Sequence, residues 1–141
     1  MRQLNPLSVF QADNRYARFK RPVDCLSSDS IGDSVYIRAG FAGGRWQVAK
    51  ADPGDDAKMP AVGILISKSS TTEGEVQLWG EVPSIFSSLS IGRTYHVDYN
   101  GVTLNVPIIG VNGYSWVQDF GFALSDDILF LVGNIVKWKH R

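Results

Sequence analysis

Two stretches of the chain decide the fold: residues 26–37 read LSSDSIGDSVYI, and residues 86–97 read FSSLSIGRTYHV. The second stretch repeats the first about sixty positions later, and self-similarity at a fixed spacing is the sequence signature of a duplicated unit. Two further pairs of segments continue the repeat: 61–67 with 119–125, and 76–80 with 129–133. We therefore predict that the core is built from two degenerate copies of one β-unit.

The rest of the chain reads as short strands separated by turns. Apolar and polar residues alternate along residues 33–38, 45–51 and 75–82, as they do in strands that turn one face toward a core. Asn100-Gly101 stands between two β-rich runs, which is the strongest local signal for a hairpin, and only residues 83–89 could hold one short helical turn. Roughly nine such strands predict an all-β fold, either an antiparallel β-sandwich or a small β-barrel.

Matched apolar positions in the two copies form the predicted interior. Because a duplication suggests a pseudo-twofold axis, we expect equivalent strands of the two copies to meet in one core. Gly63 and Gly121 occupy matched points inside strands, where a glycine marks a bulge or a close approach of backbones. The predicted interior pairs are Ile31 and Ile91, Val35 and Tyr95, Ile37 and Val97, Ile64 and Phe122, Ile66 and Leu124, and Leu78 and Leu131.

Length and charge predict one domain with basic ends. The chain has 141 residues, of which 44% are hydrophobic and 20% charged, a balance that suits one packed domain and argues against wholesale disorder. The formal net charge is zero, but basic residues gather at both ends and acidic residues in the middle. We predict an extended basic N-terminal arm over 1–22, a single duplicated β domain over 23–136 and a basic C-terminal tail over 137–141. Since no apolar run approaches the roughly eighteen residues of a membrane-spanning helix, and the first residues do not resemble a secretory signal, we expect no membrane partner.

The sequence offers few residues for catalysis or metal binding. His96 and His140 are the only histidines, and we expect His96 to be an exposed strand residue rather than a general base. The lone Cys25 is expected to be a buried structural thiol. The aspartates within 52–56 lack the spacing of a calcium loop, and the glycines within 40–44 lack the lysine of a phosphate-binding loop. We predict no catalytic, cofactor-binding or metal-binding residue.

Binding to a protein partner is expected at the two basic ends. Aromatic residues stand among the arginines of the arm and need a surface to cover them, so docking onto another protein is favoured over a nucleic-acid tail. Phosphate contacts alone would give weak, salt-sensitive affinity. The predicted partner-binding residues are Phe10, Arg15, Tyr16, Arg18, Phe19, Lys20 and Arg21 in the arm, and Lys137, Trp138 and Lys139 in the tail.

A pattern of glycines, aliphatic runs and one tyrosine covers about residues 33–133. It resembles a β-module of tailed-bacteriophage virion proteins, which occurs in head-decoration, fibre and tail components. Tyr95 and the glycines match the module, whereas Ile91-Gly92-Arg93 stands where the module often has Pro-Gly ahead of the tyrosine. The resemblance implies a virion structural role. It is carried by residues 60–66, 74–82, 89–98, 101–103, 120–125 and 128–130.

These features favour a non-enzymatic capsid decoration or cement subunit, assembled in the host cytoplasm and located on the virion surface. In this hypothesis the body sits over junctions between capsomers, the arm bridges neighbouring major capsid proteins, and copies of the chain associate as dimers or trimers. The alternative is a tail, baseplate or fibre module that binds host glycans through exposed tryptophans, although tryptophans in such a protein are more often core or interface residues. A third class, a small carbohydrate-active enzyme, needs a pair of carboxylates, and no pair stands out. The tryptophans concerned are Trp46, Trp79, Trp116 and Trp138.

Overall fold

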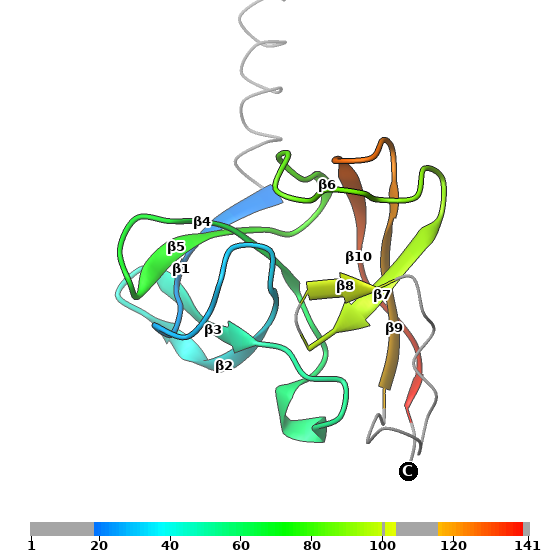
Figure 1. Cartoon of the computed structure of the whole chain (residues 1–141). Coiled ribbons are helices and arrows are strands. Elements are labelled where there is room, and N and C mark those ends of the chain that lie inside the picture. Colours follow the sequence, from blue (N-terminus) through cyan, green and yellow to red (C-terminus); the bar gives the residue numbers. More distant parts are fainter. Residues whose placement is uncertain (1–18, 100, 104–115, 140–141) are drawn as a thin grey trace, which may run out of the picture.

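The fold consists almost entirely of strands. The computed structural model describes residues 19–99, 101–103 and 116–139, with 133–139 as backbone only. Within these ranges the chain forms ten β-strands and one short 3₁₀ helix, so the predicted all-β class is confirmed. Figure 1 shows two units beside each other: the first half of the chain forms a closed barrel, and the second half forms an open sheet.

The barrel closes because its first strand pairs with both the third and the fifth. The order around it is β1-β3-β2-β4-β5, and β5 returns to β1. β1 and β3 run parallel, whereas the other neighbours run antiparallel. The strands are β1 (Lys20–Asp24), β2 (Ser34–Ala42), β3 (Arg45–Lys50), β4 (Gly63–Lys68) and β5 (Glu73–Gln77).

Side chains of β3 hold this strand against β1. Arg45 donates from Nε to Asp24 Oδ1 at 3.0 Å, and from Nη2 to the carbonyl oxygen of Val23 at 2.9 Å and that of Gly74 at 3.2 Å. Gln47 donates to the other oxygen of Asp24 at 2.7 Å. Hydrogen bonds from a guanidinium to a carboxylate are stronger than neutral ones, so Arg45 contributes to closure beyond the backbone pairing.

The open sheet has the order β6-β10-β9-β7-β8. The 3₁₀ helix η1 (Asp56–Lys58) lies in the connection between β3 and β4, and residues 83–89 form no helix, so the helical turn predicted there is wrong. The strands of the sheet are β6 (Gly80–Glu81), β7 (Thr94–Asp98), β8 (Gly101–Thr103), β9 (Trp116–Ala123) and β10 (Leu129–Lys139).

The barrel and the sheet repeat one topology. Starting from β1, the barrel reads β1-β5-β4-β2-β3, and the sheet reads β6-β10-β9-β7-β8, so every strand has a counterpart five strands later. The registers agree as well, since Val35 lies opposite Gly63 in the barrel and Tyr95 lies opposite Gly121 in the sheet. The predicted duplication is therefore confirmed at the level of individual residue pairs.

Backbone contacts at the paired glycines repeat too. A Cβ on Gly63 would collide with the carbonyl oxygen of Gln77, and a Cβ on Gly121 would collide with that of Phe130. Gln77 and Phe130 are themselves counterparts, because Ile64 and Phe122 pair with them in the same register. The close backbone approach predicted at both glycines is confirmed.

The turn before the second strand of each unit is the third repeated feature. The N–H of Gly32 donates to the carbonyl oxygen of Leu65 at 2.8 Å, and the N–H of Gly92 donates to that of Ala123 at 2.7 Å. Both glycines have positive φ, 100° for Gly32 and 77° for Gly92, which a residue without Cβ adopts at low cost. The turn therefore explains the glycine of each repeated Ile-Gly pair.

The two units pack in tandem rather than about a twofold axis. Side chains alternate along β4, so Leu65 faces the barrel interior while Ile64 and Ile66 face the sheet. The counterpart of Leu65 in the sheet is Ala123, which belongs to the same buried cluster as Ile64 and Ile66. The inward face of the second unit thus covers the outward face of the first. Equivalent strands, β4 and β9, do meet in one core, but through opposite faces and not in the pseudo-twofold arrangement that was predicted.

Two hydrophobic clusters result from this arrangement. The smaller cluster fills the barrel, and the larger one joins barrel and sheet. The barrel cluster consists of Val23, Cys25, Val35, Val48, Leu65 and Val76. The joining cluster consists of Ala51, Met59, Ala61, Ile64, Ile66, Val82, Leu89, Tyr95, Val97, Trp116, Phe120, Ala123, Leu129 and Leu131.

A buried glutamine adds a polar tie between the units. Gln118 of β9 is completely buried, and its amide makes two hydrogen bonds with the backbone of Ala61, just before β4. Gln118 Nε2 donates to the carbonyl oxygen of Ala61 at 2.8 Å, and the N–H of Ala61 donates to Gln118 Oε1 at 2.9 Å. Both backbone polar groups of buried Ala61 are thereby satisfied by one side chain.

Tandem packing explains two of the five errors in the predicted interior. Phe122 and Leu124 are the counterparts of Ile64 and Ile66, but nothing in the described chain covers them, and they are 36% and 43% exposed. Ile37 is exposed at one end of the barrel.

The two isoleucines of the repeated Ile-Gly turns are also exposed, contrary to prediction. Ile31 and Ile91 precede the glycines that form the turns, and the turns direct both side chains toward solvent. The remaining predicted interior residues are buried, apart from half-buried Leu78: Val35, Ile64, Ile66, Tyr95, Val97 and Leu131.

Candidate functional site

The first strand of the barrel starts within the range that was predicted as the N-terminal arm. Lys20 and Arg21 belong to β1 and pair with Gln77 and Val76 of β5, so the arm boundary predicted at residue 22 is wrong. Phe19 is described and contacts Trp79. The other predicted arm residues, Phe10, Arg15, Tyr16 and Arg18, lie outside the described residues.

The predicted C-terminal tail is likewise part of a strand. Lys137, Trp138 and Lys139 belong to β10, whose backbone pairs with β9 up to Lys139 opposite Trp116. The boundary predicted at residue 137 between the β domain and a basic tail is therefore wrong. The side chains of these three residues lie outside the described part of the structure.

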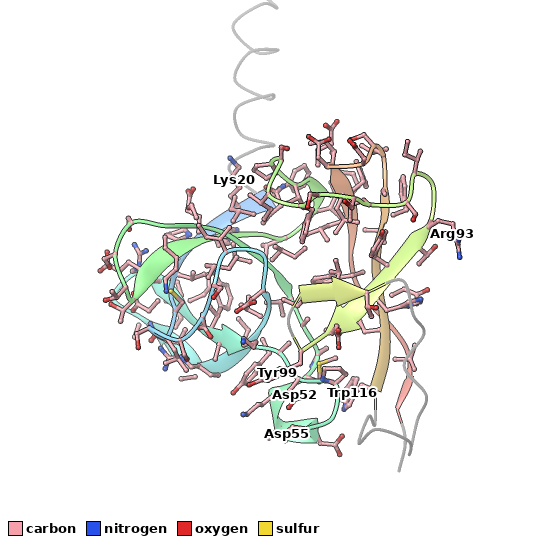
Figure 2. All side chains as sticks on the ribbon, viewed as in Figure 1. Lys20, Asp52, Asp55, Arg93, Tyr99 and Trp116 are labelled. Atoms are coloured by element: carbon pink, nitrogen blue, oxygen red, sulfur yellow. The ribbon has the colours of Figure 1, made fainter. Side chains whose placement is uncertain are left out.

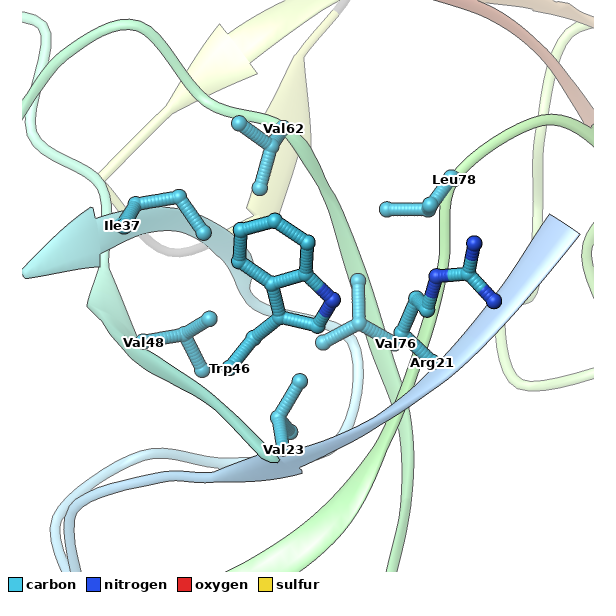
Figure 3. A pocket seen from close by; sticks show the side chains of 8 residues that line it. All are labelled: Arg21, Val23, Ile37, Trp46, Val48, Val62, Val76 and Leu78. Atoms are coloured by element: carbon cyan, nitrogen blue, oxygen red, sulfur yellow. The ribbon is translucent and has the colours of Figure 1, made fainter. Parts of the chain in front are cut away.

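One end of the barrel forms an apolar pocket with a cation at its rim. Figure 3 shows the indole of Trp46 lying across the pocket, with the Arg21 guanidinium beside Leu78. The cavity measures about 160 Å³, and Phe41 packs edge-on against Trp46 next to it. Such a pocket has room for one apolar side chain whose neighbour carries a negative charge. Its lining consists of Arg21, Val23, Ile37, Trp46, Val48, Val62, Val76 and Leu78.

The outward face of the sheet is an exposed apolar surface. Phe122 lies opposite Phe130 on β10, and the two rings stack with centroids 5.4 Å apart. Leu124 follows β9 and adds a second exposed apolar side chain. In the first unit the counterpart surface, formed by Ile64 and Ile66, is buried under the sheet. The outward face is therefore covered in the first unit and uncovered in the second.

A row of four aromatic rings connects this face to the start of β1. Trp79 packs between Phe19 and Phe130, with centroid separations of 4.9 Å to each, and Phe130 stacks on Phe122. Trp79 is 42% exposed despite these contacts. Offset and edge-on ring pairs of this kind stabilise one arrangement of the side chains, so the row is a rigid platform rather than a set of separate rings.

Beside the aromatic row lies a groove with a mixed lining. Its volume is about 560 Å³, and it lies where β1, β5, β6 and β10 converge. Gln77 lies at its base and is 98% buried, yet its Oε1 has no hydrogen-bond partner among the described residues. The Gln77 amide nitrogen donates to the carbonyl oxygen of Trp79, which fixes the orientation of the side chain. The groove is lined by Phe19, Lys20, Gln77, Trp79, Gly80, Glu81, Val82, Pro83, Ile128 and Phe130.

The sequence contains a weak signal for this groove. Gln77 is a polar residue flanked by Val76 and Leu78 in an apolar strand, and its counterpart by register is Phe130. A polar residue at a position that is aromatic in the other copy marks a local departure from the shared scaffold. Neither Gln77 nor Glu81 was predicted as a site residue, because the groove forms only when β6 crosses from the barrel to the sheet.

His96 is buried rather than exposed, so the prediction for it is wrong. Its Nδ1 lies 2.8 Å from Asp119 Oδ1, on the neighbouring strand β9. Its cross-strand neighbours within the sheet are Thr103 on β8 and Asp119 on β9. A histidine paired with one carboxylate resembles the base and its orienting group in a hydrolase, but such chemistry also needs a nucleophile within reach of the free ring nitrogen.

The aspartates of the 52–56 loop all have structural partners. Asp52 accepts from the N–H of Gly54, and Asp55 accepts from the N–H of Ala57 and caps η1, each at 2.9 Å. Asp56 accepts from the indole nitrogen of Trp116 at 2.8 Å. Figure 2 shows this loop at the end of the molecule away from Lys20. Within the described ranges, no three His, Cys, Asp or Glu side chains are placed to hold one metal ion.

Two further titratable groups are buried inside the first unit. The Cys25 thiol is 99% buried, as predicted, and burial raises its pKa. Burial also raises the pKa of Asp33, whose carboxylate accepts from the N–H of Ser30 at 2.8 Å in the repeated turn. At the surface, the Ser84 hydroxyl donates to Asp127 and lowers the pKa of that carboxyl. These groups stabilise local structure and do not converge on one cavity.

Comparison with known proteins identifies no relative. Neither a family model, nor a curated protein, nor a solved structure matches this chain. In the part of the chain that the structure describes, no helix has the length and apolar character required to cross a bilayer. The surfaces of the chain itself therefore carry the argument about function.

Proposed function

We propose that this chain is a non-enzymatic structural subunit of a tailed-bacteriophage virion, a decoration or cement protein that binds neighbouring capsid proteins. The observation that carries the proposal is the uncovered outward face of the sheet, formed by Phe122, Leu124 and Phe130. Its counterpart in the first unit is buried by an adjoining β-unit. An exposed apolar face rimmed by polar residues is typical of a protein-binding surface.

A second contact in the proposal is the barrel end next to the N-terminal segment. Arg21 has no ion-pair partner among the described residues, and it lies at the rim of the pocket that Trp46 crosses. A capsid segment with an apolar side chain next to a carboxylate would fill the pocket and neutralise Arg21. Residues 1–18 precede this point in the chain, so an arm that spans neighbouring capsid proteins would begin there.

The resemblance to virion β-modules supports the same proposal. The segments that carry the resemblance contribute to β4 and β5 of the barrel and to all five strands of the sheet, and two residues of the apolar face, Phe122 and Phe130, lie on strands. Strands hold exposed side chains in fixed positions, which suits adhesion to a repeated, symmetric surface. Copies of the chain would then be arranged as dimers or trimers by the symmetry of the capsid.

The test is binding of the full-length chain to phage heads assembled without it. We expect the protein to sediment with these heads and to raise their resistance to heat. Phe122→Ser combined with Leu124→Ser, or Arg21→Glu alone, should weaken binding by about tenfold or more, as loss of central interface residues does. Ile31→Ser removes a somewhat more exposed apolar side chain from a turn and serves as the control.

Two outcomes would contradict the proposal. One is failure of the wild-type chain to bind such heads. The other is binding by the Phe122, Leu124 and Arg21 variants that equals binding by the Ile31 control. Deletion of residues 1–18 separates the contribution of the N-terminal segment, and we expect that deletion to weaken binding and head stability together.

A further inference from the structure

The second strand of the barrel has an open edge along its outer half. β4 pairs with β2 only at Ser34 and Val35, where the N–H of Val62 donates to the carbonyl oxygen of Val35 at 2.7 Å. Over residues 36–42, β2 pairs with β3 on one side, and none of the described strands pairs with it on the other. Such an edge offers free backbone N–H and C=O groups, to which an extended segment of another chain can add.

This edge lacks two of the usual protections against strand addition. Residues 36–42 contain no lysine or proline, and their one charged side chain, that of Arg38, is turned back onto β3. Arg38 Nε donates to the carbonyl oxygen of Val48 at 2.7 Å, and Nη2 donates to Gln47 Oε1 at 3.3 Å. Register shifts follow Ile37, so a short segment fits the edge better than a long strand.

The barrel pocket opens beside this edge. Ile37 lines the pocket from β2, and Val62 lines it from the segment that leads into β4. Figure 3 shows both residues at one side of the Trp46 indole and Arg21 at the other. Because alternate side chains of a strand point to opposite faces, a strand added to β2 would direct every second side chain toward the pocket. The cavity of about 160 Å³ has room for one of them.

The charge at the pocket defines the chemistry of the added segment. Arg21 is the one charged residue of the lining, and it forms no ion pair within the described ranges. The other lining residues are aliphatic, apart from the indole of Trp46. A guanidinium binds a carboxylate through two parallel hydrogen bonds. A segment with one apolar side chain and an acidic residue close to it would satisfy both parts of the site.

We infer that the chain recognises its partner by strand addition: an extended segment of the capsid protein pairs with the β2 edge at Ile37 and places an apolar side chain in the pocket and an acidic one at Arg21. This mode of binding rests on the proposed function, because it takes the partner to be a capsid protein. Backbone pairing supplies affinity for any extended segment, and the pocket with Arg21 selects its sequence.

The experiment is titration of the full-length protein with synthetic heptapeptides of alternating valine and threonine. The central residue is leucine, isoleucine or phenylalanine, and an acidic residue stands one or two positions before or after it. We expect at least one peptide to bind with a dissociation constant in the millimolar range or tighter and to slow amide hydrogen exchange over residues 36–42. N-methylation of alternate backbone nitrogens should weaken binding by about tenfold or more in one of the two possible patterns, because only alternate N–H groups face β2.

Two variants and their matched controls test the side-chain contacts. Arg21→Glu should weaken binding of the acidic peptide by about tenfold or more and should favour the same peptide with lysine in place of the acid. Arg93→Glu reverses an exposed charge just before β7, which Figure 2 shows on the sheet, and should change neither. Ile37→Lys places a charge on the edge and should weaken binding, whereas Ile91→Lys at a 69% exposed position should not. A thermal melt checks that every variant is folded.

The outcomes separate strand addition from the proposed function. Absence of binding by every peptide overturns the inference, and so does equal binding by both N-methylated patterns and the unmodified peptide, even if the protein binds phage heads. Hexanoate binding as tightly as the peptides would assign the pocket to small carboxylates, and self-association lost in Ile37→Lys would assign the edge to a second copy; either result overturns it. Peptide binding without head binding would support strand addition and contradict the capsid partner.

Discussion

Adding one methyl group at either of two matched glycines should destabilise the protein, whereas the same change at a third glycine should not. The pair is Gly63 on β4 and Gly121 on β9, and the control is Gly40 on β2. A Cβ on Gly40 would have no heavy atom within 4 Å, and its φ is not positive. The expectation follows from the repeated register that places Gly63 against the carbonyl oxygen of Gln77 on β5 and Gly121 against that of Phe130 on β10.

The size of the effect can be worked out from the contacts. At Gly121 the new methyl would meet the carbonyl oxygen of Phe130 and lie 3.1 Å from the Cα of Leu131, so only separation of the strands could relieve it. At Gly63 one of the two nearest atoms is a methyl of Val76, which can move. Forced overpacking costs about 1–3 kcal/mol, and a Gly→Ala change gains about 0.4–1 kcal/mol through the unfolded chain. We expect a net loss of about 2 kcal/mol for Gly121→Ala, a smaller loss for Gly63→Ala, and a small gain for Gly40→Ala.

Urea unfolding followed by tryptophan fluorescence, together with calorimetry, measures these differences. Because the two units share one hydrophobic cluster, a single cooperative transition is expected for wild type. In a domain of this size a loss of about 2 kcal/mol corresponds to a fall in Tm of about 6–8 °C. If both Gly63→Ala and Gly121→Ala were as stable as Gly40→Ala, the matched registers would be wrong, and the argument from duplication would fail with them.

Three further predictions concern closure, the tie between the units and pH. Arg45→Ala should lower the free energy of unfolding by about 2 kcal/mol, because it removes charge-assisted hydrogen bonds that close the barrel. The control, Arg93→Ala at an exposed position, should change it by less than about 0.5 kcal/mol. Equal effects of the two substitutions in urea titration would contradict a role of Arg45 in closure. Gln118→Leu should cost about 2–4 kcal/mol, since the buried N–H and C=O of Ala61 both lose their partner, and a wild-type unfolding midpoint would disprove this tie. Asp33→Asn should raise the free energy of unfolding at about pH 7, because the raised pKa of Asp33 means that its ionised form is disfavoured in the folded chain. This gain should vanish as the pH falls and the wild-type carboxyl becomes protonated. An equal gain at about pH 3 would refute the reasoning.

The difference between the closed barrel and the open sheet has a residue-level cause. In the barrel, Asp24 receives hydrogen bonds from Arg45 and Gln47 on the strand that completes the closure. In the second unit Lys20 has Glu81 as its counterpart, since Lys20 lies opposite Gln77 as Glu81 lies opposite Phe130. β6 ends at Glu81, two residues before Pro83, so it has no segment equivalent to Val23–Asp24 that could pair with β8. The second unit therefore remains open, and its inward face is free to cover the barrel.

The candidate sites were only partly predictable. Arg21 was identified from the charge of the N-terminal segment, and the structure places it at the rim of the barrel pocket. Trp79 was named among the tryptophans of the glycan-binding alternative, but the groove beside it was not identified, because its lining combines residues 19–20, 77–83 and 128–130. His96 was expected to face solvent on strand alternation alone, yet its environment depends on β8 and β9 lying on either side of β7.

What the sequence determined by itself is local and repeated. Alternation of side chains, the Ile-Gly turns and the paired glycines depend on the backbone geometry of a few neighbouring residues, and they predicted strands, duplication and close approach correctly. The tertiary structure alone decided which face of each unit is covered, because identical patterns in Ile64 and Phe122 give no information about which copy has a neighbour. Burial depends on what packs against a face, and the tandem order of the units leaves the second outward face, and the groove beside it, open to partners.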